Sequence, residues 1–396
     1  MDFVKKNKFL LIYFLFFLIF NVLLYLFIQN FNQTIKFNNL NYKYNAHHYF
    51  QDERINGGPF NLLRALGQYD AQWYLKVANS GYPKDPENTN LSDKSEMGSL
   101  SYAFFPLYPL LLFLFNKVFA NIETSAFILS NILLLVNFIS LIYVVGKLFS
   151  KQIAYKAVFL LFTFPFAIFF RSYFTEGLQL FLLIWFSYFL VKKRWVKSAI
   201  FLSFLTITKG NVILLTILFF YTCFREVKPK SFFKKDMMAL LAIVFAPFLL
   251  WIAFNYIYTG NPLYFYNIRS EWFKPSFPLL PLLWNFALLF YYPALPFHSF
   301  HLSMIDYLSV ILILLLLFKS KKLLGYKLWW MSFLLWITPL LVTDTMSYTR
   351  YEIVSFPIFI YLAHVLKKIS YFIVLGVFLI GLFVASILFV NWYWLG

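Results

Sequence analysis

The sequence predicts an all-α polytopic membrane protein, and three observations support this class. Of its 396 residues, 61% are hydrophobic and only 13% are charged, so a water-soluble fold would lack the polar side chains to cover its surface. Several apolar stretches reach or approach the roughly 20 residues that a helix needs to cross a bilayer. These stretches do not alternate polar and apolar residues as outer-membrane strands do, so helices are the expected spanning element.

The first apolar stretch begins directly after a basic N-terminus. Lys5, Lys6 and Lys8 precede an apolar run of twenty residues that ends at the polar residues 29–32. A secretory signal peptide has a shorter apolar region and a cleavage site of small residues, so we expect an uncleaved first helix. Later stretches that reach or approach spanning length are 125–145, 240–257, 304–318 and 371–390.

Basic residues cluster in six short segments between the apolar stretches. Together the segments hold 21 of the 34 Lys and Arg residues but only three of the 16 Asp and Glu residues. Such clusters mark the cytoplasmic side, so we expect a multi-pass protein with a cytoplasmic N-terminus, in the cell membrane if the source is prokaryotic. Topology therefore explains the formal charge of +18, and no nucleic-acid partner is expected. The segments are 1–8, 147–156, 192–197, 225–236, 319–327 and 367–368.

A single membrane domain, residues 1–396, is expected, because the chain shows no internal repeat and no soluble domain. Two long segments, 29–123 and 258–302, are expected outside the cytoplasm. The apolar stretches 104–119 and 279–295 each contain two or more prolines, so we expect them to lie at the outer surface rather than to cross the membrane.

The segment 198–224 predicts a hairpin of two short helices, because cytoplasmic signals flank it on both sides. Its tip, residues 208–211 (Thr-Lys-Gly-Asn), carries Lys209. A cation at membrane depth is costly unless protein surrounds it. We therefore expect the tip to lie in a protein-lined cavity below the outer surface.

In the first outer segment, residues 69–82 predict a short helix that Asp70 precedes and Gly81 ends. Two interpretations of Asp70 are open. Its side chain either caps the helix by accepting hydrogen bonds from the amides of Gln72 or Trp73, or it faces a functional site. Spacing alone favours the cap.

Arg171 and Glu176 lie in a short outer turn between two apolar helices. Charges near the hydrocarbon usually face a cavity, which makes both residues candidates for a site. In the alternative interpretation, Glu176 complements the dipole of the helix that it starts and pairs with Arg171. Lys209 and Arg350 bring positive charge towards the same face, either to hold a phosphate or to reach lipid headgroups by snorkelling.

No metal or cofactor is expected from the sequence. His298 and His301 are three residues apart, but no convincing third ligand lies near them. The single cysteine, Cys223, excludes an internal disulfide and a multi-cysteine metal site. A phosphate-binding glycine loop and a Ser-His-Asp set are also absent.

Four segments, in their order and spacing, resemble the PIG-V-type mannosyltransferases, a branch of the GT-C glycosyltransferases. The family motifs are Trp-Asp-x-x-Trp-Tyr…Gly-Tyr, Phe-Phe-Pro-Leu-Tyr-Pro, Tyr-x-Ser/Thr-Glu and Asn-Pro-x-x-Phe…Trp. Residue Tyr69 replaces the usual Trp, and Lys209-Gly210 stands where Arg-Pro is typical. Arg350-Tyr351 followed by Phe-Pro is a weaker match. The matching segments are 69–74 with 81–82, 104–109, 173–176 and 261–272.

The resemblance implies a GT-C-like helical bundle with about 10–11 transmembrane helices and a long first extracytoplasmic loop that carries membrane-surface helices. It implies a metal-independent, inverting transfer of a sugar from a polyprenyl-phosphate donor to a glycan, lipid or protein acceptor, with membrane lipids as further partners. Asp70 would act as the general base, outside the cytoplasm. The donor phosphate would meet Arg350, Lys209 and Arg171. The substrate would contact Trp73, Tyr74, Glu176, Arg269, Trp272 and Tyr351.

Three alternatives are open. A GT-C enzyme with another donor sugar, such as arabinose or glucose, keeps the fold and changes the specificity. A transporter or flippase of lipid-linked sugars would commonly show internal repeats, and none is recognisable. A ligand-binding or scaffold membrane protein would carry out no chemistry.

Overall fold

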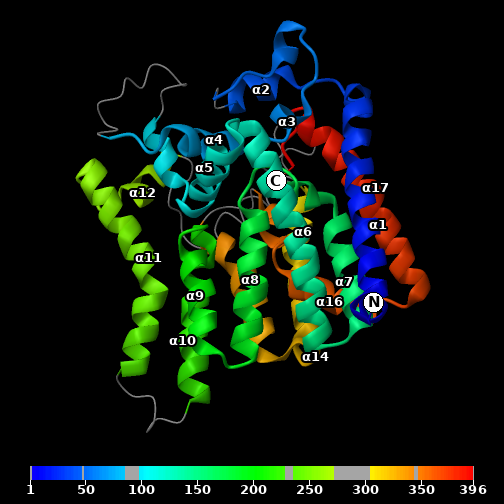
Figure 1. Ribbon diagram of the computed structural model, residues 1–396, viewed down its shortest axis with the longest axis vertical. Helices are drawn as coiled ribbons and strands as arrows, with labels where there is room; N and C mark the ends of the chain where they lie inside the picture. Colours follow the sequence, from blue (N-terminus) through cyan, green and yellow to red (C-terminus); the bar gives the residue numbers. More distant parts are fainter. Residues whose placement is uncertain are drawn as a thin grey trace.

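The computed structural model describes residues 2–46, 49–84, 98–227, 235–271, 304–342 and 347–395. Within these ranges the regular structure consists of α-helices and short 3-10 helices, with no strand (Figure 1). The all-α prediction is confirmed for this part of the chain. The apolar stretch expected at 279–295 lies outside the described residues.

Among the described residues, four helices are long and apolar enough to cross a membrane: α1 (Asp2–Phe31), α6 (Ile122–Leu148), α11 (Lys235–Thr259) and α17 (Lys368–Val390). Several other helices are shorter. The element α14 (Met304–Val342) consists of two helical segments that meet at a kink at Gly325, whose φ of 66° is positive. The further helices of the bundle are α7 (Lys151–Thr163), α8 (Glu176–Val191), α9 (Trp195–Thr206), α10 (Leu214–Glu226), α14 (Met304–Val342) and α16 (Phe356–Val365).

The helices run between two ends of the molecule (Figure 1). The turns α6–α7, α8–α9 and α16–α17 lie with the N-terminus at one end, which we call the basic end. There Glu226 forms ion pairs with Lys193 at 3.2 Å and Lys327 at 2.9 Å, and Lys156 donates a hydrogen bond to the carbonyl of Leu366. The described parts of the predicted basic segments thus gather at one end of the bundle.

The opposite end, which we call the loop end, consists of short helices from the first long loop (Figure 1). A helix, α5, is present where the surface helix was predicted, and the predicted helix after Asp70 is present as α4. Because Gly81 has a φ of 77°, it ends α4 in a conformation that glycine adopts without strain. The bounds are α2 (Asn39–Asn45), α3 (Leu62–Ala65), α4 (Ala71–Ser80) and α5 (Leu107–Phe119), with α12 (Tyr264–Asn267) and α15 (Tyr348–Glu352) nearby.

The predicted hairpin at 198–224 is present as α9 and α10, joined by the short η7 (Gly210–Val212). Beside it, the backbone amide of Leu107 at the start of α5 donates a hydrogen bond to the carbonyl of Ile207 at 3.1 Å. This bond connects the loop-end helix α5 to the tip of the hairpin. The tip is therefore held at the level where α4 and α5 cover the bundle.

Candidate active site

Asp70 occupies the position before α4 but does not cap it. Its side chain makes no hydrogen bond to the amides of the first turn. Instead, Oδ2 accepts a hydrogen bond from Nη1 of Arg350 at 3.2 Å, and the side chain keeps 28% of its surface exposed. The capping interpretation is therefore wrong. Asp70 is a partly accessible carboxylate in contact with a cation that is 280 residues away in the sequence.

Arg350 connects two carboxylates that are far apart in the sequence. Its guanidinium, only 5% exposed, contacts Asp70 through Nη1 and lies 3.1 Å from Oε1 of Glu176 through Nε. The same Oε1 accepts a hydrogen bond from Nζ of Lys209 at 2.7 Å. Negative and positive groups thus alternate in the order Asp70, Arg350, Glu176 and Lys209. We call these four residues the charge chain.

The surroundings of Arg350 keep it cationic. Burial lowers the pKa of a guanidinium, but the carboxylates of Glu176 and Asp70 offset this effect, so the pKa of Arg350 lies above its usual value. The guanidinium also lies over the rings of Tyr351 and Trp394, at 5.1 Å from each centroid. The cation at the centre of the charge chain is therefore permanent.

The backbone has a positive φ immediately before Asp70 and immediately before α15, which carries Arg350. Tyr69 precedes Asp70 with a φ of 53°, and Ser347 precedes α15 with a φ of 62°. Non-glycine residues in this region cost roughly 1–3 kcal/mol each, and such strain clusters at functional sites. The hydroxyl of Tyr69 accepts a hydrogen bond from Asn41 at 2.9 Å, which helps to hold this conformation.

A polar cavity of about 130 Å³ opens beside the charge chain. Asp70, Arg350 and Lys209 contribute charged groups to its wall, together with Arg269 from the segment after α12. Among the described residues, Arg269 forms no ion pair, so its charge is available to a ligand. The remaining lining residues are Tyr74, Ala103, Phe104, Phe105, Thr208, Gly210, Ser347, Tyr351 and Trp394.

An apolar cavity of about 250 Å³ continues from the polar one. The two cavities share five lining residues, and the apolar one extends between the tip of the α9–α10 hairpin, α11 and α14. A Cβ atom at Gly210 would lie 3.0 Å from Nη1 of Arg269, so glycine allows the guanidinium to lie against the hairpin tip. The lining residues are Phe105, Thr206, Lys209, Gly210, Asn211, Ile213, Phe248, Phe265, Tyr266, Arg269, Thr338, Pro339 and Tyr351.

No protein-family model, curated protein or solved structure matches this chain. The chemistry of the site therefore has to be inferred from its residues. A carboxylate, several cations, aromatic walls and a continuous apolar cavity together suit a ligand with an anionic centre and a long apolar tail. Within the described residues, no group of three His, Cys, Asp or Glu side chains is placed to hold a metal ion.

Most of the site residues predicted from the sequence converge on this place. Asp70, Arg350 and Lys209 line the polar cavity, as do Tyr74, Arg269 and Tyr351. The hairpin tip lies in a protein-lined cavity, as predicted. Trp272 lies outside the described residues, as do His298 and His301.

Trp73 and Glu176 do not line the cavities, although the resemblance implied that both contact the substrate. Trp73 is 2% exposed and stacks on Phe104 with 5.8 Å between ring centroids, so it supports the cavity wall from behind. Glu176 is fully buried and holds the two cations in place without lining either cavity. The ion pair between Glu176 and Arg171, expected as an alternative, is not formed.

Arg171 lies away from the charge chain. Its guanidinium is fully buried and donates hydrogen bonds to Oδ1 of Asn21 and to the carbonyls of Ala167 and Phe162, at 2.8 to 3.2 Å. It lines neither cavity, so a ligand in these cavities does not contact it. The expectation that Arg171 binds the phosphate is corrected to a role in joining α1, α7 and the turn before α8.

Sequence reasoning missed Trp394. This residue packs against Tyr69 at 4.5 Å between ring centroids, lies under the Arg350 guanidinium and lines the polar cavity. Its signal was the segment 391–395 (Asn-Trp-Tyr-Trp-Leu), which follows the last apolar helix. Such a segment is typical of a membrane-interface belt, and only the folded chain places it next to Arg350.

Proposed function

We propose that this protein is a membrane-embedded glycosyltransferase that transfers a sugar, preferentially mannose, from a polyprenyl-phosphate donor to an acceptor hydroxyl. One observation carries the proposal. The accessible carboxylate of Asp70 lies in a cavity that also contains Arg269 and Lys209, and this cavity continues into an apolar one. A lipid-phosphate sugar needs each of these parts. The resemblance of segments 69–82, 104–109, 173–176 and 261–272 to PIG-V-type mannosyltransferases supports the same reading.

The proposal includes a multi-pass topology of about ten or eleven crossings, with the basic end in the cytoplasm. The shorter helices of the bundle would cross together with the four long ones. The loop end, and the site with it, would then face the extracytoplasmic side, because basic clusters remain in the cytoplasm. Figure 1 supports this arrangement, since the turns between helices alternate between the two ends.

In the proposed reaction, the acceptor oxygen attacks the anomeric carbon of the sugar while the bond from that carbon to the phosphate oxygen breaks. The carboxylate of Asp70 removes the proton of the acceptor hydroxyl, and the bonding electrons leave with the lipid phosphate. Attack from the face opposite the leaving group inverts the anomeric centre. General-base assistance of this kind typically contributes roughly 10²–10⁴ in rate.

The leaving phosphate gains negative charge, which requires nearby cations. Arg269 suits this task best, because it lines both cavities and forms no ion pair with a described residue. Lys209 lies at the same junction, where Glu176 already balances part of its charge. The rings of Tyr74, Tyr351 and Trp394 line the polar cavity and offer surfaces for packing against a sugar.

The decisive experiment measures sugar transfer by the purified protein in nanodiscs, with polyprenyl-phosphate mannose as donor and hydroxyl-bearing acceptors. We expect transfer by the wild type and a loss of roughly 10²–10⁴ in rate for Asp70→Asn. Glu53→Gln is the matched control, because Glu53 belongs to the same loop and pairs with Arg64 outside the cavity. This variant should keep the wild-type rate.

Full activity of Asp70→Asn would show that another group is the base. Absence of transfer from mannosyl, glucosyl and arabinosyl lipid phosphates alike would overturn the enzyme proposal itself. Transfer from a glucosyl or arabinosyl donor in place of the mannosyl one would keep the reaction and change its specificity.

A further inference from the structure

A second apolar depression, separate from the two cavities, lies between α4, α5 and α11. We call it the lateral groove. Its volume is about 950 Å³, at the upper end of the range for small-molecule sites. The lining residues are Val77, Ala78, Asn79, Ser80, Gly81, Tyr82, Lys84, Pro106, Pro109, Leu110, Phe113, Ile207, Pro247, Leu250, Trp251, Phe254 and Tyr258.

A thin wall separates the groove from the candidate active site. Phe105 lines both cavities, whereas its neighbour Pro106 lines the groove. Thr206 lines the apolar cavity, whereas its neighbour Ile207 lines the groove. Within this wall the amide of Leu107 donates a hydrogen bond to the carbonyl of Ile207. The groove is therefore a site of its own and not an extension of the cavity proposed for the donor.

The length of the groove matches one leaflet of a bilayer. On α11 its lining runs from Pro247 to Tyr258, which is about 16 Å of helix at roughly 1.5 Å per residue. The hydrocarbon core of a bilayer is about 30 Å thick, so the groove covers half of it. Leu110 and Leu250, 52% and 71% exposed, leave its side apolar and open. An acyl chain that enters from the bilayer therefore meets a mostly apolar surface.

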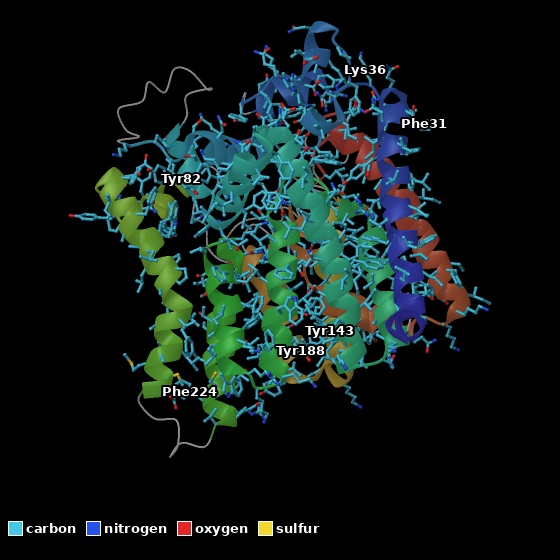
Figure 2. All side chains as sticks on the ribbon, in the orientation of Figure 1. Phe31, Lys36, Tyr82, Tyr143, Tyr188 and Phe224 are labelled. Atoms are coloured by element: carbon cyan, nitrogen blue, oxygen red, sulfur yellow. The ribbon has the colours of Figure 1, made fainter. Side chains whose placement is uncertain are left out.

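The charge at the end of the groove favours an anionic headgroup. Lys84 lies at the loop end, where its Nζ is 5.4 Å from the ring centroid of Tyr258. Among the described residues that line the groove, Lys84 is the only cation and no carboxylate is present. Figure 2 shows Tyr82 beside the upper part of α11, and its ring lies 5.0 Å from that of Trp251. The aromatic residues Tyr82, Trp251 and Tyr258 therefore line the groove close to Lys84.

We infer that the lateral groove binds one anionic lipid from the leaflet on the loop-end side, with its chain along α11 and its headgroup at Lys84. This inference rests on the membrane location proposed above but not on sugar transfer. Since Val77 to Ser80 of α4 and the following Gly81 form one wall of the groove, the bound lipid packs against the helix that follows Asp70.

The test is native mass spectrometry of the full chain released from nanodiscs of phosphatidylglycerol or phosphatidylcholine, with no donor present. We expect one phosphatidylglycerol to stay bound to the wild type and phosphatidylcholine to be lost. Lys84→Glu reverses the exposed charge and should weaken retention of phosphatidylglycerol roughly tenfold to thirtyfold. Leu110→Trp should also weaken retention, because it places a larger ring at the side of the groove where the acyl chain would lie.

Two matched controls lie outside the groove. Leu114→Trp makes the same change on α5 at a residue that is 51% exposed, and Lys36→Glu reverses an exposed charge of the loop end. Both should retain the lipid as the wild type does. Equal retention by Lys84→Glu and wild type, or equal retention of phosphatidylcholine, would overturn the inference. Because no sugar is transferred in this assay, a failure of the proposed function leaves its result unaffected.

Discussion

At the scale of single residues, the charge chain explains why buried ionic groups persist in an apolar protein. Glu176 is 1% exposed and accepts from Lys209 while it contacts Arg350, so each charge has an opposite neighbour. A buried ion pair contributes little net stability compared with apolar residues of the same size, but removing one partner exposes the full desolvation cost of the other. We therefore expect a single substitution in the charge chain to lower the stability of the fold more than a substitution of both members of a pair.

Glu176→Gln tests this reasoning. It leaves Lys209 and Arg350 with less compensation and should destabilise the fold by about 3–5 kcal/mol, measured by denaturant unfolding of the detergent-solubilised protein. The double variant Glu176→Gln with Lys209→Met removes both members of the pair and should recover part of this loss. If the loss of unfolding free energy in the double variant equals the sum of the losses in Glu176→Gln and Lys209→Met alone, the ion pair contributes no coupling free energy.

At the scale of elements, close packing of α17 determines where the segment before α8 lies. A Cβ atom at Gly381 would lie 2.6 Å from Cγ of Pro165, the first residue of η6 (Pro165–Phe170). A proline ring can shift only by changing its pucker, so it has little freedom to move aside. Because η6 leads through Arg171 to Glu176, the contact between α17 and η6 helps to position the charge chain.

Gly381→Ala should therefore force α17 and η6 apart, at a cost of about 1–3 kcal/mol for overpacking. The better helix propensity of alanine offsets roughly 1 kcal/mol of this, so the net result is a lower melting temperature. Gly376→Ala is the control on the same helix, because a Cβ atom there meets nothing within 4 Å. Equal melting temperatures for the two variants would contradict the packing argument.

Elements were more predictable from this sequence than the contacts between them. The helix after Asp70, the proline-containing α5 and the hairpin around Lys209 follow from local signals such as apolar periodicity and flanking charges. The partner of Glu176 did not follow from such signals. Arg171 is close in sequence, yet Glu176 pairs with Lys209, which is 33 residues away. Trp394 was missed for the same reason, because its contact with Arg350 depends on tertiary packing.

At the scale of the whole molecule, the two ends of the bundle allow its orientation to be tested. Figure 2 shows Lys36 at the loop end and Tyr188, Tyr143 and Phe224 towards the basic end. Lys193, close in sequence to Tyr188, exposes 60% of its side chain. Cys223, the only cysteine of the chain, is buried and can be replaced by serine to give a background without thiols.

In this background, Lys36→Cys and Lys193→Cys place one exposed thiol at each end. We expect a membrane-impermeant maleimide added to intact cells to label Lys36→Cys alone, because the basic end should remain in the cytoplasm. Opening the membrane should then allow labelling of Lys193→Cys, and a permeant maleimide should label both variants from the start. Labelling of Lys193→Cys alone in intact cells would place Asp70 on the cytoplasmic side. Labelling of both would mean that the bundle does not separate its two ends across a bilayer, and the proposed extracytoplasmic reaction would then have no membrane face on which to occur.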